Sequence, residues 1–318
     1  MQTATQNPAA ASARRRMYDS KAFEAQYHTD QPLGALWTPQ ATRFALWAPT
    51  ARRVELSLYE DGCSGAPQLT TELARAGRGV WQVLLEGDLD GRYYDFSVTD
   101  SEGVTRRTAD PWARACGRDG ARSMVVDLRR TDPEGWQQDA PPAHGTEDII
   151  YEVHVKDFSH DPHSGVPEAL RGKYLALTLN GTTLDGDGIH PTCIDYLRQL
   201  GVTHVQLMPV YDFGSVPEGQ GDNYNWGYDP VNYNVPDGWY ATDPDDGAVR
   251  IRELKAAVQA LHRNGFRVVM DVVYNHTYKL DSWLWRTEPW YFYRQNPDGT
   301  PADGSGCGND LALSLIHI

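Results

Sequence analysis

Hydrophobic and polar residues alternate in short runs between residues 32 and 128, and turn signals separate these runs. Asp-Gly or Glu-Gly pairs at 61–62, 90–91 and 102–103 accept the positive φ of tight turns. Because successive side chains of a strand point to opposite faces, this pattern predicts an antiparallel β-sandwich of about 100 residues. The predicted strands are Arg43–Trp47, Val54–Tyr59, Val80–Leu85, Tyr93–Val98 and Met124–Leu128.

The pattern changes after residues 130–147, a stretch with several prolines that we interpret as a linker. Continuous apolar runs rich in β-branched residues follow, as in strands buried on both faces of a parallel sheet. These runs are 149–155, 202–210 and 266–274. Helical patterns at 192–200 and 248–264 separate them, so the sequence predicts the opening of a (β/α)-type domain. An eight-stranded barrel needs about 250 residues, so either the sheet is open or the barrel is incomplete.

Composition and charge exclude several classes of function. The 318 residues are 40% hydrophobic and 23% charged, as in a soluble globular protein. The formal net charge of −14 repels nucleic acid and anionic lipid, which favours a neutral substrate. We find neither a secretory signal nor a run of about 18 apolar residues, and we expect a cytoplasmic protein without a membrane span. The scattered cysteines argue against a disulfide framework or a zinc site.

The strongest candidate for chemistry is the polar end of the third apolar run, Asp271-Val272-Val273-Tyr274-Asn275-His276. An ionised Asp271 inside an apolar strand needs a partner, because burying an unpaired charge costs several kcal/mol. Polar residues at the C-terminal ends of parallel strands form the active-site face of α/β proteins. Asp271 in a structural ion pair and His276 as a satisfied loop histidine remain the alternative.

Two aromatic clusters lie in predicted loops. The first is Tyr224-Asn225-Trp226-Gly227-Tyr228-Asp229-Pro230, where flat rings adjoin amide and carboxylate groups, as the C–H faces and hydroxyl rim of a sugar require. The second comprises Trp283, Trp285, Trp290, Tyr291, Phe292 and Tyr293. Aromatic residues at this density usually form a core, but here Gly, Pro, Asp and Asn surround them, which is hard to reconcile with a core.

These motifs resemble a known family. Residues 224–230 (YNWGYDP) look like the signature loop of type I pullulanases, and 271–276 (DVVYNH) like the first conserved region of the α-amylase superfamily. Residues 151–158 (YEVHVKDF) and 201–213 (GVTHVQLMPVYDF) resemble the first two barrel strands of pullulanases. The sandwich resembles the glycogen-type carbohydrate-binding module that precedes such barrels. The resemblance implies an immunoglobulin-like β-sandwich followed by the first part of a (β/α)8 TIM barrel, truncated after about three strands.

The resemblance assigns roles to the residues of the two motifs. Tyr228 is expected to stack under the glucose unit at the cleavage site, next to Trp226 and Asp229, and His276 to bind hydroxyls of the same sugar. Asp271 is expected to anchor the charge network of the site. Asn275 matches a position that binds calcium in many amylases but varies among pullulanases. No cofactor is otherwise required.

The implied reaction is retaining hydrolysis of an α-1,6-glucosidic linkage in pullulan, glycogen or limit dextrin, by a carboxylate nucleophile and a carboxylic acid. In the superfamily the nucleophile Asp, the acid Glu and a stabilising Asp follow strands four, five and seven. None matches a residue of this chain, so we assign no catalytic residue and expect the chain as given to be inactive. The alternatives are a non-catalytic glucan-binding protein and a related glycogen debranching or branching enzyme.

We predict five segments along the chain. The apolar end departs from the family pattern and is predicted to be non-native, while Arg14–Arg16 in the N-terminal arm is predicted to be a solvated tail. The segments are a partly disordered arm (1–30), the sandwich (31–129), the linker (130–147), the incomplete barrel (148–310) and the non-native tail (311–318).

Overall fold

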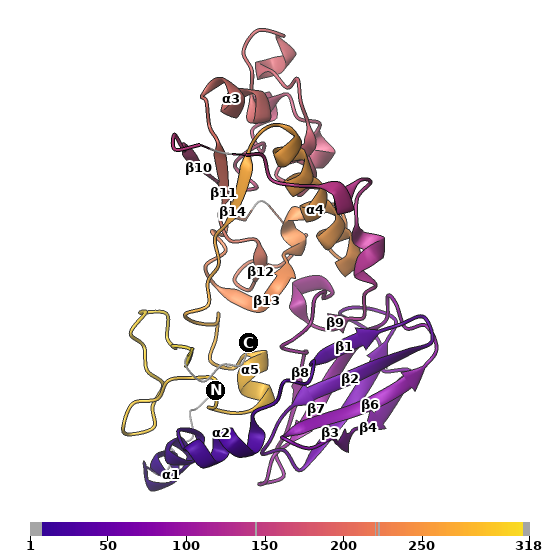
Figure 1. Ribbon diagram of the computed structural model, residues 1–318, viewed down its shortest axis with the longest axis vertical. Coiled ribbons are helices and arrows are strands. Elements are labelled where there is room, and N and C mark those ends of the chain that lie inside the picture. Colours follow the sequence, from indigo (N-terminus) through magenta and orange to yellow (C-terminus); the bar gives the residue numbers. More distant parts are fainter. Residues whose placement is uncertain (1–7, 144, 220, 222, 314–318) are drawn as a thin grey trace.

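The computed structural model describes residues 8–143, 145–219, 221 and 223–313. A β-sandwich lies at one end of an elongated molecule, and a partial β/α unit lies at the other (Figure 1). Two N-terminal helices and the C-terminal segment pack together beside the sandwich (Figure 1). Among the described helices, none is long and apolar enough to span a membrane.

The sandwich consists of two antiparallel sheets. One has the order β1-β2-β6-β5, and the other β4-β3-β7-β8 with β9 also paired to β7. The strands are β1 (Gly34–Trp37), β2 (Ala41–Trp47), β3 (Arg53–Tyr59), β4 (Leu69–Glu72), β5 (Ala74–Arg75), β6 (Val80–Glu86), β7 (Tyr93–Thr99), β8 (Thr105–Thr108) and β9 (Ser123–Met124). The predicted sandwich is therefore confirmed. Of the last predicted run, only Met124 is in a strand, and a 3-10 helix begins at Leu128.

The sandwich core forms from the inward residues of both sheets. Phe44, Leu56, Tyr94 and Phe96 are fully buried, and the ring centroids of Phe44 and Tyr94 are 5.0 Å apart. Trp81 is also buried in this core, whereas Trp37 is partly exposed. The alternation of the sequence identified the strands, but it did not say which tryptophans face inward.

A parallel sheet of three strands in chain order begins the second unit. It contains β10 (Ile150–Val153), β11 (His204–Leu207) and β14 (Arg267–Met270). Two α-helices, α3 (Cys193–Gln199) and α4 (Gly247–Arg263), follow β10 and β11, as predicted. The core of this unit contains residues from the strands and from both helices, such as Val205, Leu197 and Leu261.

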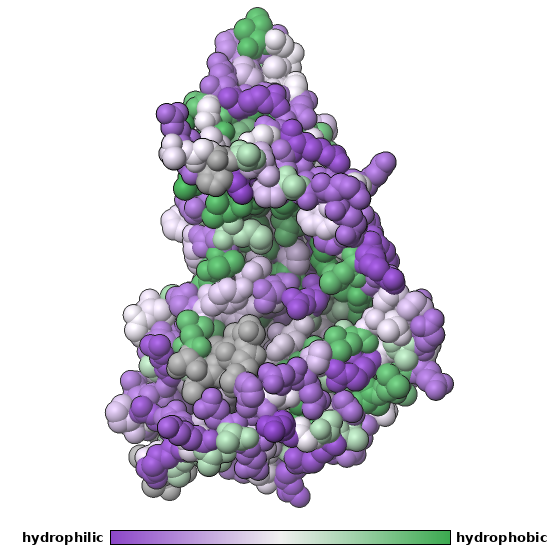
Figure 2. Space-filling view, viewed as in Figure 1, coloured by the Kyte–Doolittle hydropathy of each residue, from purple (hydrophilic) through white to green (hydrophobic). Residues whose placement is uncertain are grey.

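The edges and one face of this sheet are open to solvent. Figure 2 shows hydrophobic surface gathered over the middle of the molecule, at the level of the partial barrel in Figure 1. The exposed apolar residues of the strands and their ends include Ile149, Ile150, Tyr151, Met270 and Val272. The sheet formed by the described strands therefore exposes apolar side chains at its edges.

Several short elements complete the structure. A two-stranded hairpin forms from β12 (Tyr211–Phe213) and β13 (Pro230–Pro236), and the loop between these strands contains most of the YNWGYDP motif. The 3-10 helices are η1 (Arg118–Gly120), η2 (Leu128–Thr131), η3 (Trp136–Gln138), η4 (Pro162–Ser164), η5 (Glu168–Leu170), η6 (Tyr174–Thr178), η7 (Leu184–Gly186) and η8 (Gly238–Tyr240). The remaining helices are α1 (Pro8–Tyr18), α2 (Lys21–Tyr27) and α5 (Trp283–Thr287).

The predicted linker is bound to the second unit. Lys255 of α4 donates to Asp132 Oδ1 at 2.6 Å, and His262 Nδ1 lies 2.7 Å from Asp139 Oδ2. Gln259 of the same helix donates to the carbonyl of Glu134. The linker therefore lies along α4 instead of separating two independent units.

Four of the six residues of the second aromatic cluster form a core, and our sequence interpretation was wrong for these four. Trp290, Tyr291, Phe292 and Tyr293 are each at most 9% exposed and pack against Trp47 of the sandwich, together with aromatic residues of the N-terminal helices. The glycines and prolines around these residues correctly indicated a loop. Segments that are far apart in sequence cover this loop, and local sequence does not reveal such packing.

The N-terminal arm is helical and packed where the structure describes it. Tyr18 is buried, and the guanidinium of Arg14 lies 4.9 Å from the ring centroid of Trp290. Arg15 and Arg16 are exposed, so the predicted solvated tail is wrong for Arg14 but correct for its two neighbours. At the other end, Leu311 and Ala312 are buried, and residues 314–318 of the predicted non-native tail lie outside the described residues.

A buried carboxyl group joins the arm, the sandwich and the C-terminal segment. Tyr18 donates to Glu288 Oε1 at 2.7 Å, and the backbone and hydroxyl of Thr50 donate to Oε2 and Oε1 at 3.2 and 2.5 Å. Burial raises the pKa of Glu288 to about 7. Burial therefore favours the protonated form of Glu288 where the three segments meet.

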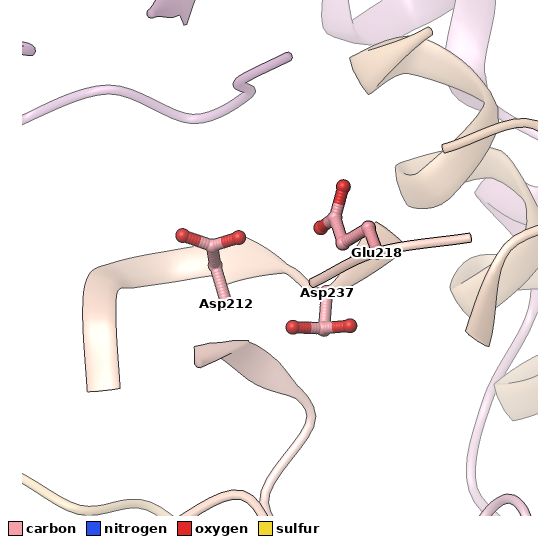
Figure 3. Close-up of side chains that lie close together, drawn as sticks. All are labelled: Asp212, Glu218 and Asp237. Carbon is pink, nitrogen blue, oxygen red and sulfur yellow. The ribbon is translucent and has the colours of Figure 1, made fainter. Parts of the chain in front are cut away.

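A second buried cluster fixes the base of the β12–β13 hairpin. Figure 3 shows that the carboxyl groups of Asp212, Glu218 and Asp237 lie close together, and Arg250 of α4 donates to Glu218 through two bonds of 2.8 and 2.6 Å. All four side chains are at most 1% exposed. Burial, together with the charge of Glu218, raises the pKa of both Asp212 and Asp237. One arginine does not balance three carboxylates, so the cluster retains protons.

The same cluster holds the sandwich against the hairpin. The backbone N–H of Asp119, in η1, donates to Glu218 Oε2 at 3.0 Å, and Asn232 of β13 donates to Asp212 Oδ2 at 2.7 Å. A Cβ on Gly120 would lie 2.3 Å from Asp212 Oδ2, which only a glycine avoids. The end of the sandwich and the hairpin base therefore pack so closely at Gly120 that a larger residue does not fit there.

We predict that Glu288→Gln makes the free energy of unfolding less dependent on pH between about 4.5 and 7. The pKa of Glu288 is about 7 in the folded state and 4.5 in the reference state, so the folded protein holds a proton that the unfolded chain releases in that window. The free energy of unfolding then falls as pH rises from about 4.5 to 7. The variant lacks this loss. Its free energy of unfolding should therefore exceed that of the parent by up to about 3 kcal/mol at pH 8, but not at pH 4.

Urea unfolding of parent and variant at both pH values measures this difference. Glu102→Gln, at an exposed position, is the control and should change neither value. Equal stabilities of parent and Glu288→Gln at pH 8 would contradict the account of this joint.

Candidate glucan-binding site

The candidate site is the segment 224–230, at the end of the loop that connects β12 and β13. This segment contacts residues that follow each of the three parallel strands. Gly227 has a φ of +85°, and a Cβ at this position would lie 2.5 Å from the carbonyl oxygen of Pro209. Only glycine permits both this conformation and this close approach to the end of β11. The loop consequently lies directly on the chain that follows the central strand.

Tyr228, Asp271 and His276 lie together. The hydroxyl of Tyr228 donates to Asp271 Oδ2 at 2.7 Å, and His276 Nε2 donates to the Tyr228 carbonyl, also at 2.7 Å. Burial, and then the hydrogen bond and charge of Asp271, raise the pKa of Tyr228 to about 12, so the phenol stays protonated at neutral pH. The strand end after β14 thus supplies both groups that orient Tyr228.

The side chains of this trio differ in exposure. Tyr228 is 38% exposed, whereas His276 is 6% exposed, and its Nδ1 is buried without a hydrogen-bond partner among the described residues. We expected His276 to face the sugar directly. In this structure it holds the Tyr228 backbone, and contact between Nδ1 and a hydroxyl requires covering atoms to move.

The other end of the loop is held by the strand end after β10. Tyr224 donates to Asp157 Oδ2 at 2.7 Å, and Lys156 Nζ donates to the carbonyl of Asn223 at 2.7 Å. His154 accepts from the Asp157 N–H at Nδ1, so its Nε2 is the donor to the Asn225 carbonyl, 2.8 Å away. The His154 and Tyr224 rings also pack together, with centroids 4.7 Å apart and an interplanar angle of 33°.

Sequence reasoning missed these residues as part of the site. His154, Lys156 and Asp157 are polar groups at the end of an apolar strand, which is the same signal that identified Asp271. The signal was available, but we used the segment only as evidence of resemblance. Arg250 and Glu218 had no such signal, because the cluster forms between segments that are distant in sequence.

The remaining predicted residues have distinct surroundings. Trp226 is 60% exposed at the loop tip, next to the exposed rings of Tyr224 and Tyr228. Asp229 accepts from the Ser215 N–H at 2.7 Å through Oδ2, while Oδ1 is buried without a partner among the described residues. Asp229 therefore supports the loop, and Trp226 offers a free ring.

Calcium binding by Asn275 stays a prediction from the resemblance. Its side chain is exposed, and its carbonyl accepts from the Leu311 N–H at 3.0 Å. Within the described part of the chain, the one group of three carboxylate, histidine or cysteine side chains close enough to share an ion is Asp212, Glu218 and Asp237. Arg250 already supplies the cation of that group.

Two protein families match the chain. Residues 32–113 match carbohydrate-binding module 48, the isoamylase N-terminal domain, and residues 162–293 match the alpha amylase catalytic domain. The first match covers strands β1 to β8 of the sandwich, and the second covers two of the three parallel strands and the candidate loop. Both agree with the expected order of the two units.

Curated relatives with similar sequences are pullulanases. The chain is 39% identical over 295 residues to the pullulanase of Bacillus subtilis (strain 168), covering 92% of this chain and 39% of the relative. It is 35% identical over 329 residues to pullulanase 1, chloroplastic, of Arabidopsis thaliana, covering 89% of this chain and 33% of the relative. The chain thus spans less than half of the length of these relatives.

Solved structures give the same result. The pullulanase from Paenibacillus barengoltzii in complex with maltohexaose and α-cyclodextrin superimposes with a TM-score of 0.89 at 41% identity, over 94% of this chain and 46% of that one. The pullulanase from Bacillus acidopullulyticus superimposes with a TM-score of 0.85 at 44% identity, over 91% and 35%. The chain is thus similar in sequence and in fold to pullulanases over most of its own length, and it matches carbohydrate-binding module 48 and part of the alpha amylase catalytic domain.

Proposed function

We propose that this chain holds an α-glucan for a debranching hydrolase that cleaves α-1,6-glucosidic linkages in pullulan, glycogen or limit dextrin. The observation that carries the proposal is the orientation of Tyr228 by Asp271 and His276 on the active-site face of the parallel strands. The P. barengoltzii pullulanase, a structural neighbour, was solved with maltohexaose and α-cyclodextrin bound.

The three exposed rings of the loop suit a glucan better than they suit a charged ligand. Tyr224, Trp226 and Tyr228 are 47%, 60% and 38% exposed, and the rings of both tyrosines are oriented by carboxylates. Such rings offer flat apolar faces to the C–H surface of glucose units. The net charge of −14 favours a neutral ligand over an anionic one.

The residues of this chain would bind and orient the sugar, not break the bond. Tyr228 provides the platform, Asp271 keeps its hydroxyl in place, and His276 holds its backbone carbonyl. In the family the nucleophile and the acid lie after later strands, about 5 to 5.5 Å apart for a retaining mechanism. A cytoplasmic location stays a prediction from the sequence alone.

We predict that Tyr228→Ala weakens maltotetraose binding by about tenfold, corresponding to about 1.4 kcal/mol. The alanine removes the ring, whereas Tyr228→Phe keeps the ring and loses only the bond to Asp271, so it should weaken binding less than about threefold. Titration calorimetry on the purified chain measures both effects. Tyr196→Ala, which removes a similarly exposed tyrosine on α3, is the control and should have no effect. Equal affinities of parent and Tyr228→Ala would refute the platform.

We further predict that a protein extending this chain through the remaining barrel strands releases maltotriose from pullulan. Release requires hydrolysis of α-1,6 linkages, so the assay separates a debranching enzyme from a glucan-binding protein. The 318-residue chain assayed alongside should release none, because it has no match to the nucleophile or the acid. Maltotriose release by the 318-residue chain, or none by the longer protein, would contradict the proposal.

A further inference from the structure

Tyr224 is a second ring of the loop that is held in a fixed orientation. Its hydroxyl donates to Asp157 Oδ2 at 2.7 Å, and its ring packs on His154 with the centroids 4.7 Å apart. Burial, and then the hydrogen bond to Asp157, raise the pKa of Tyr224 to about 12, so the hydroxyl stays a donor at neutral pH. Tyr224 is still 47% exposed, so the ring face opposite His154 is available to a ligand.

Asp157 places hydrogen-bond acceptors beside this ring. The Asp157 side chain is 58% exposed, and a carboxylate has about four lone-pair sites, of which the Tyr224 hydroxyl uses one. A ring face next to a reachable carboxylate matches the C–H face and the hydroxyl rim of a glucose unit. The notebook of a sugar site, one flat surface and one acceptor, is therefore present at Tyr224 as well as at Tyr228.

Buried groups fix the backbone on both sides of Tyr224. Lys156 Nζ donates to the carbonyl of Asn223 at 2.7 Å, and His154 Nε2 donates to the carbonyl of Asn225 at 2.8 Å. Lys156 and His154 are each 7% exposed. The ring is therefore ordered before a ligand arrives, which lowers the entropy that binding costs.

Tyr224 and Tyr228 are held by different strands of the parallel sheet. Asp157 follows β10 and Asp271 follows β14, and β11 lies between these two strands. Neighbouring strands are about 4.8 Å apart, so β10 and β14 are separated by about 10 Å, which is more than the width of one sugar ring. The two tyrosines are thus suited to different units of one glucan chain.

We propose that Tyr224 and Asp157 form a second glucose subsite, which binds a further unit of the same α-glucan chain that rests on Tyr228. Tyr224 stacks on this unit, and Asp157 accepts from one of its hydroxyls, while Lys156 and His154 are positioning residues. Because the class of ligand is taken from the proposed function, the subsite rests on that function. Affinity should rise with glucan length, since only a longer chain reaches both rings.

Titration calorimetry of the 318-residue chain with maltotetraose, and with glucose as its competitor, tests the proposal. We expect Tyr224→Ala to weaken maltotetraose binding at least tenfold and glucose binding less than twofold. Tyr224→Phe keeps the ring and loses only the bond to Asp157, so it should weaken maltotetraose binding less than about threefold. Tyr196→Ala, at a similarly exposed tyrosine of α3, is the control and should change neither affinity.

Two variants of Asp157 separate its role from support of the loop. Asp157→Ala removes the acceptor for the Tyr224 hydroxyl and for the sugar, so it should weaken maltotetraose binding at least threefold and leave glucose binding within twofold. Asp157→Asn keeps an acceptor oxygen and should restore most of this loss. A variant that only disturbs the loop would weaken the binding of both sugars together.

The outcomes distinguish the subsite from the proposed function. Equal losses for glucose and maltotetraose in Tyr224→Ala would overturn the subsite, because Tyr224 would then only support the loop. Weakening by Tyr228→Ala without any by Tyr224→Ala would also overturn it and leave the proposed function intact. Binding of neither sugar to the parent chain would overturn both.

Discussion

The buried cluster of Arg250 with Asp212, Glu218 and Asp237 is the interaction on which the site depends. It joins α4, both strands of the hairpin region and the end of the sandwich in one desolvated network. Breaking a buried ion pair on one side costs about 3 to 5 kcal/mol, because the partner charge is left unpaired. The base of the hairpin is therefore fixed independently of the loop that it carries.

The loop above this base is fastened at both ends by strand termini. Asp157 and its neighbours after β10 bind one end, and Asp271 and His276 after β14 bind the other. The hydroxyls of Tyr224 and Tyr228 are used in these bonds, which leaves the Tyr228 ring and the face of Tyr224 opposite His154 for a ligand. A binding surface of this kind is ordered before the sugar arrives, which lowers the entropy that binding costs.

The sequence predicted the elements of this structure better than their contacts. Periodicity located the strands and helices, since it depends on neighbours in sequence, and the polar strand end located Asp271. It did not locate the burial of Tyr291 and Phe292, because the N-terminal helices that cover them lie about 270 residues away. It also assigned His276 to direct sugar contact, whereas the structure buries it behind Tyr228. Residue roles that depend on packing between distant segments could be assigned only from the three-dimensional structure.

Hydrogen exchange in Arg250→Met tests whether the cluster fixes the loop. The amides of Gly214, Ser215 and Gly227 donate to acceptors in the loop, and they should exchange at least about tenfold faster in the variant. Amides of β2 and β3 in the sandwich should keep their rates, as should all of these amides in Arg198→Met, which cuts an exposed pair on α3. Unchanged exchange at Gly214, Ser215 and Gly227 in a folded Arg250→Met protein would contradict the account.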